Sequence, residues 1–133
     1  MAIIKPNNNT LSAITALPAG LGGKVLQVVT ATTATNTNTD SQSFVATSLT
    51  ANITPSATSS KVYVCACSDL DNQVSSVQAF ATIYRDSTNL ANVGSSYNFG
   101  NCFVLNGRGI FPISMHTLDT PSSTSQLTYT VRI

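Results

Sequence analysis

Hydrophobic and polar residues alternate along most of the chain after residue 24, in short runs that polar segments separate. Val77–Arg85 and Leu127–Ile133 place apolar side chains at every second position. This two-residue period is typical of β-strands, in which successive side chains point to opposite faces. The pattern predicts eight strands, which are Val25–Ala34, Phe44–Ile53, Lys61–Cys67, Val77–Arg85, Leu90–Val93, Cys102–Leu105, Gly109–Leu118 and Leu127–Ile133.

Three local signals refine this prediction. Lys61–Cys67 is almost continuously apolar, which favours a central strand, and a loop is expected directly after it at Asp69–Asn72. Asn106-Gly107 is a strong β-hairpin signal. Pro112 lacks a backbone donor and therefore predicts an edge strand or a bulge. We expect an all-β fold, namely an antiparallel β-sandwich of jelly-roll-like topology, with a barrel or an immunoglobulin-like sandwich as the alternatives.

Residues 1–23 differ from the β-patterned domain 24–133. They contain Ile3 and Ile4, then Leu11, Ile14 and Leu17 at three-residue spacing, and they end in a glycine-rich stretch. Glycine permits many backbone conformations, so this stretch indicates a hinge. Two interpretations stay open: a frayed terminus, or an extended N-terminal arm whose apolar side chains dock on another surface.

Composition narrows the functional classes. The chain holds 19 Thr, 17 Ser and 12 Asn, and only 8% of its 133 residues are charged, against about 25% in an average soluble protein. Its hydrophobic content of 42% is sufficient for a core and argues against a disordered chain. A net charge of +1 offers no electrostatic footprint for nucleic acid or membrane phosphates. No run approaches the roughly 18 apolar residues of a membrane span.

Catalytic groups are scarce, because the chain has one His and no Glu. Ser114 and His116 would share one strand face, with Asp119 just beyond. Side chains two positions apart on a strand run parallel instead of converging, so strand geometry opposes a triad. We expect no enzyme activity, no cofactor and no metal centre.

Other polar and sulfur-containing residues give weak signals. Binding of a surface cation by Asp69 and Asp71 is an open alternative, although the segment lacks the glycine and the distal Glu of a calcium loop. Arg108, in a glycine-flanked tip, is expected to be solvated. Cys65 and Cys67 would point to one strand face and are expected to be small buried hydrophobes. Three cysteines cannot form a complete internal disulfide framework.

Several segments together resemble a known family. Gly22–Val29 resembles the "GGKVLQVV" opening of small virion proteins of tailed bacteriophages, especially aquatic and cyanobacterial ones. Four further segments are similar to sequences of the same proteins, namely Ile3–Ser12, Leu49–Val62, Ile83–Thr88 and Leu118–Pro121. The resemblance implies a non-enzymatic, trimeric, β-rich virion component. It does not fix the location on the particle, because related domains occur both on capsid decoration proteins and at the tips of tail or head fibres.

The resulting hypothesis is a capsid decoration (cement) protein of the virion, assembled in the host cytoplasm. It would form homotrimers and bind the major capsid protein or other virion proteins through its arm, with Ile3, Ile4, Leu11, Ile14 and Leu17 as anchors. Burial of exposed β-edges in an oligomer supports the homotrimer. The alternative is a fibre tip that binds a host glycan or surface protein through Tyr97, Asn98 and Phe99. A hydrolase centred on His116 is the third reading.

Overall fold

The computed structural model describes residues 25–91 and 99–133. These residues form seven β-strands and no helix, which confirms the all-β, antiparallel prediction. The strands are β1 (Ala46–Ile53), β2 (Val62–Asn72), β3 (Val77–Arg85), β4 (Thr88–Asn89), β5 (Gly100–Val104), β6 (Gly109–Asp119) and β7 (Leu127–Arg132).

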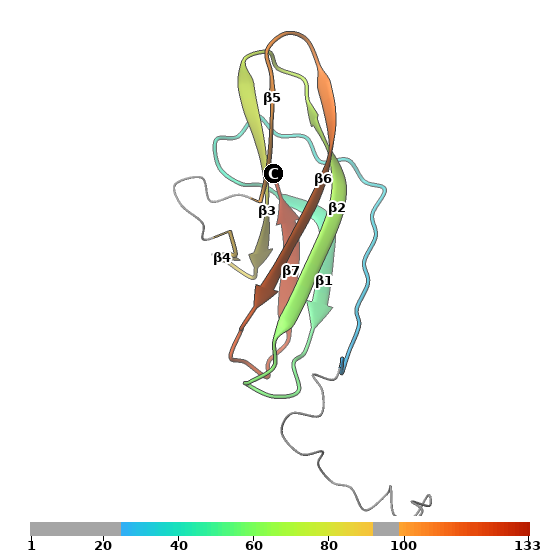
Figure 1. Cartoon of the computed structure of the whole chain (residues 1–133), viewed down its shortest axis with the longest axis vertical. Coiled ribbons are helices and arrows are strands. Elements are labelled where there is room, and N and C mark those ends of the chain that lie inside the picture. The colour runs from blue at the N-terminus through green and yellow to red at the C-terminus, as the bar shows by residue number, and fades with distance from the viewer. Residues whose placement is uncertain (1–24, 92–98) are drawn as a thin grey trace, which may run out of the picture.

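The strands form two antiparallel sheets (Figure 1). The larger sheet has the order β1-β7-β3-β4, and β5 also pairs with β3. Two strands pair with successive parts of β3: β5 pairs with residues 77–81, and β7 pairs with residues 82–85. The smaller sheet contains β2 and β6, which pair without interruption from Val62↔Asp119 to Asn72↔Gly109.

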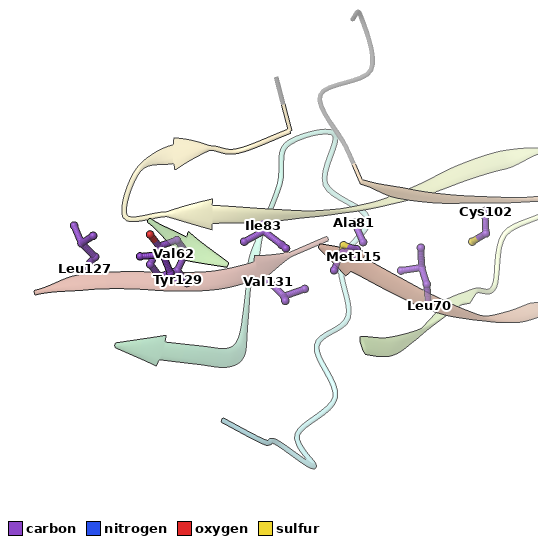
Figure 2. Close-up of a cluster of buried hydrophobic side chains, with 9 residues drawn as sticks. All are labelled: Val62, Leu70, Ala81, Ile83, Cys102, Met115, Leu127, Tyr129 and Val131. Atoms are coloured by element: carbon purple, nitrogen blue, oxygen red, sulfur yellow. The ribbon is translucent and has the colours of Figure 1, made fainter. Parts of the chain in front are cut away.

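One hydrophobic core lies between the inner faces of the two sheets (Figure 2). Ile83 of the larger sheet and Met115 of the smaller sheet are each only 1% exposed. Alternate residues of β7 belong to the same core, as its two-residue pattern predicted. The buried cluster consists of Val62, Leu70, Ala81, Ile83, Cys102, Met115, Leu127, Tyr129 and Val131.

The second sheet differs from the prediction in the length and position of β2. The expected loop at Asp69–Asn72 is wrong, because β2 continues to Asn72. Leu70 and Asn72 are buried while Asp69 and Asp71 are exposed, so the two aspartates occupy the solvent side of a regular strand. The expected central position is also wrong, since β2 has only β6 as a neighbour in the described part of the chain.

The connections differ as well. Asn106-Gly107 forms a turn with Gly107 at a φ of 83°, but no hairpin, because β5 pairs with β3 whereas β6 pairs with β2. Pro112 lies in β6, whose single described neighbour is β2, so the edge-strand prediction is confirmed. The short strand expected at Leu90–Val93 is found earlier, at Thr88–Asn89; residues 92 and 93 lie outside the described residues.

The first expected strand, Val25–Ala34, is absent from both sheets. Residues 25–35 are extended and lie beside β1 and β2 without pairing with them (Figure 1). The described part of the domain therefore has seven strands where the sequence predicted about eight. The local pattern of this segment suits a strand, but a segment becomes a strand only when its backbone pairs with an edge, and residues 25–35 pair with neither sheet.

Candidate interaction surface

The extended segment 25–35 exposes its apolar side chains. Val25 is 77% exposed, Leu26 68% and Val28 76%. No backbone hydrogen bond to a strand is found for this segment within the described residues. Its fixed point is Thr33, whose Oγ1 lies 2.8 Å from Oγ of Ser48 in β1. Exposed apolar side chains that adjoin one another are typical of interaction sites.

A groove separates this segment from the two sheets. It has a volume of about 1440 Å³, and its walls are residues 25–38 on one side and β1 and β2 on the other. Side chains of the core, including Ile83 and Val131, reach its floor. The groove is therefore an opening into the space between the sheets.

The inward-facing side chains along this opening are incompletely covered. Leu49 and Ile53 of β1 and Val64 and Ala66 of β2 pack against the core, yet each is only half-buried. The ends of β2 are closed instead, since Val62 is 8% and Leu70 5% exposed. The alternation of β1 and β2 indicated which side chains face inward, but no sequence signal showed that the core would stay open here.

The outer face of the smaller sheet brings together residues that the sequence analysis considered separately. Tyr63 lies opposite Leu118 and Cys65 opposite His116, and the Tyr63 and His116 rings are 6.3 Å apart. Cys65 is exposed, as is Cys67, so the expectation that both are buried is wrong. Their strand has solvent on its outer face, because no further layer packs on that side of the smaller sheet in the described part of the chain.

The three residues of the tentative triad do not converge. Ser114 and His116 occupy the exposed face of β6, while Asp119 is buried on the opposite face. There Asp119 accepts hydrogen bonds from Arg85 Nη1 at 2.6 and 2.7 Å and from the Tyr129 hydroxyl at 2.6 Å. The carboxylate is thus part of a network within the fold and does not orient His116.

Asp71, one of the two aspartates considered for a cation, forms an ion pair with Arg108. Hydrogen bonding to Arg108 lowers the pKa of the Asp71 carboxyl, and Gln73 Nε2 also donates to it at 3.1 Å. Arg108 is 59% exposed, as expected of a solvated side chain, but the sequence did not indicate its ion pair with Asp71. Among residues 25–91 and 99–133, no group of three or more His, Cys, Asp or Glu side chains could hold a metal ion.

The predicted partner-binding residues fall mainly outside the described residues. This holds for Ile3, Ile4, Leu11, Ile14 and Leu17 of the arm and for Tyr97 and Asn98 of the loop. Phe99 is described: its side chain is half-buried against the core, and its backbone N–H donates to the Ala81 carbonyl at 3.0 Å. Phe99 therefore sits as an anchor at the end of its loop.

Comparison with known proteins adds no relative: no protein-family model, no curated protein and no solved structure matches the chain. No helix in the described part of the chain has the length and hydrophobicity needed to cross a membrane. The features of the protein that bear on its function are therefore the groove, the exposed segment 25–35 and the composition of the chain.

Proposed function

We propose that the protein is a non-enzymatic structural component of a bacteriophage virion, a decoration protein that forms homotrimers on the capsid surface. In this proposal residues 1–23 are the arm that grips the major capsid protein or a neighbouring virion protein. The observation that carries it is the exposed apolar stretch Val25–Val29, which directly follows the arm in the sequence. Such a stretch gains most from burial in an interface.

The composition supports attachment through uncharged contacts. With 8% charged residues, the chain can bind through hydrogen bonds and apolar contacts that depend little on ionic strength. The jelly-roll-like sandwich expected from the sequence would need a further strand beside the smaller sheet. We infer that assembly supplies this strand, and that the virion, assembled in the host cytoplasm, is where the protein resides.

The test compares the full chain with a chain that lacks residues 1–23, using purified capsids that carry no decoration protein. We expect full occupancy for the full chain and a loss of binding of at least about tenfold for the truncated chain. Circular dichroism and thermal unfolding of the truncated chain verify that residues 24–133 still fold. Undiminished occupancy by a folded truncated chain would contradict the role of the arm.

One observation favours a second candidate, the tip of a fibre that binds a host glycan or surface protein. The end of the molecule opposite residue 25 carries the β2–β3 and β5–β6 connections (Figure 1). There Val74, Phe103 and Leu105 are 58%, 49% and 67% exposed. Copy number separates the candidates: hundreds of copies in each purified virion fit decoration, whereas a few to tens fit a fibre.

A further inference from the structure

The smaller sheet is incomplete along β2. In the described part of the chain this eleven-residue strand pairs with β6 alone, so its other edge carries backbone groups without a strand partner. Such an edge is a template for another strand. Two-stranded sheets are also marginally stable by themselves, and a third strand is the usual remedy. The inward-facing Val64 and Ala66 are half-buried along this same edge.

Segment 25–35 has the complementary deficiency. Its eleven residues have the composition and alternation of a strand, but they join neither sheet. Thr33 fixes one end beside Ser48, and the apolar half, Val25–Val29, lies beyond that contact with three of its side chains at least 68% exposed. An extended segment of this length spans about 36 Å, which equals the length of β2.

The dimensions and charge of the groove favour a polypeptide occupant. Its volume of about 1440 Å³ exceeds the range of about 300–1,000 Å³ that is typical of small-molecule sites. The half-buried side chains along its middle are apolar, and residues 25–35 include no ionisable side chain. The charged residues that line the groove, Lys61, Asp69, Asp71 and Arg108, lie at the two ends of β2 and in the β5–β6 connection. Insertion of the segment along Val64 and Ala66 would therefore bury mainly apolar surface.

We propose that the groove is the seat of a strand from a second copy of this chain, and that Val25–Val29 of that copy is the strand. It pairs with the free edge of β2 and covers Val64 and Ala66, which converts the smaller sheet from two strands to three. This mode of recognition is β-strand addition, in which backbone bonds supply affinity and inward-facing side chains supply specificity.

A second copy satisfies both deficiencies with one contact, because each copy carries one such segment and one such groove. One such contact brings together eleven residues of segment 25–35 from one copy and nineteen residues of β1 and β2 from the next. This is smaller than a standard interface of about 20–30 residues on each side, but in a ring each copy takes part in two such contacts. The contact joins two different surfaces, and contacts of this kind form a closed ring, such as a homotrimer, when the rotation between successive copies closes. The inference rests on the homotrimer of the proposed function but does not depend on capsid binding.

The first experiment measures the oligomeric state of the full chain by size-exclusion chromatography with light scattering over a range of concentrations. In the variant Val25→Asp/Val28→Asp, two charges would enter the proposed interface. We expect the midpoint concentration for dissociation to rise by at least about tenfold. The free energy of unfolding of the single chain should change little, since both side chains are exposed there. The control is Val74→Asp, which places a charge at a valine that is 58% exposed at the far end of the molecule.

The outcomes separate this inference from the proposed function. A wild-type chain that is monomeric at all concentrations contradicts both the homotrimer and the strand exchange. An oligomer that neither variant dissociates, or that both dissociate equally, contradicts the strand exchange alone. Capsid occupancy, measured independently, tests decoration and is not decided by either result.

The second experiment identifies the occupant directly. Val28→Cys and Ala66→Cys are combined in a chain that carries Cys65→Ser and Cys67→Ser, and the purified protein is mildly oxidised. We expect disulfide-linked species of two and three chain masses on a non-reducing gel. A disulfide confined to one chain mass would show that the segment closes on its own groove, and the absence of any disulfide would exclude the contact. Val74→Cys with Ala66→Cys is the control pair and should remain unlinked.

Discussion

Arg85 of β3 and Asp119 of β6 form an ion pair that joins the two sheets, with Arg85 Nη1 2.6 Å from Asp119 Oδ1. The Tyr129 hydroxyl of β7 donates to the same carboxylate. Asp119 is 9% exposed and Arg85 22%, so both charges are largely removed from water. Hydrogen bonding to Asp119 raises the pKa of Arg85, which keeps the guanidinium charged. The pair fixes the smaller sheet on the larger one at the end away from the Asn106-Gly107 turn.

Asp119→Asn should destabilise the fold by about 3 kcal/mol, because it leaves the Arg85 guanidinium without a counter-charge in a partly dehydrated place. Urea denaturation of the two proteins measures the difference. Asp71→Asn is the control, since it removes the exposed ion pair with Arg108 and should leave the midpoint nearly unchanged. Equal effects of the two substitutions would show that the Arg85–Asp119 pair contributes no more than a surface pair.

Tyr129 should make the fold sensitive to high pH. Burial, followed by the hydrogen bond to Asp119, raises the pKa of the Tyr129 hydroxyl above its ordinary value of about 10. A raised pKa in the folded state means that the contribution to stability is complete below about pH 10. It decreases as the pH rises further, by up to about 1.4 kcal/mol per pH unit.

The measurement is the free energy of unfolding from pH 8 to pH 12 for the wild type and for Tyr129→Phe. The variant should be less stable at pH 8, because it loses the hydrogen bond to Asp119, and the difference should shrink above pH 10. A difference that stays constant across this range would argue against a buried, neutral Tyr129.

The elements that could be predicted are those whose pattern is complete within the element. Val77–Arg85 and Leu127–Arg132 agree with the expected strands almost to the residue, because each alternates throughout its length. Gly109–Asp119 agrees as well, and Pro112 correctly indicated its place at an edge. In β7 one face is covered by the core, so the period of the sequence reports the burial directly. In β3 the three consecutive residues Ala81–Ile83 are all buried, so there the period indicates the strand but not the burial.

The features that could not be predicted depend on partners elsewhere in the chain. Asn106-Gly107 specified a turn, but which strands β5 and β6 would pair with was decided by the rest of the sheet. Cys65 and Cys67 were expected to be buried because their run is apolar on both faces, yet one face of β2 is open to solvent. The groove exists because residues 25–35 do not pair with the free edge of β2. No local sequence pattern indicates that a strand edge will stay unpaired.

The three thiols should differ in reactivity. Burial raises the pKa of the Cys102 thiol, which lowers its thiolate fraction and also blocks access, whereas Cys65 and Cys67 are exposed. With a colorimetric thiol reagent at pH 8, we expect two thiols to react rapidly and the third only after denaturant is added. Cys102→Ser should leave the rapid phase intact, and Cys65→Ser/Cys67→Ser should abolish it. Rapid reaction of all three would contradict the buried position of Cys102.

Gly109, at the start of β6, should not tolerate a side chain. A Cβ at this position would lie 2.5 Å from Phe111 Cε2 and 2.7 Å from Cγ2 of the buried Val104. Such overlap forces packed side chains to shift, so Gly109→Ala should cost about 1–3 kcal/mol of unfolding free energy. Gly100→Ala is the matched control, because its Cβ would meet Ile113 Cγ2 at 3.4 Å and should cost much less. Chemical denaturation of both variants measures their free energies of unfolding. A Gly109→Ala protein as stable as Gly100→Ala would contradict the close packing of β5 and β6 at Gly109.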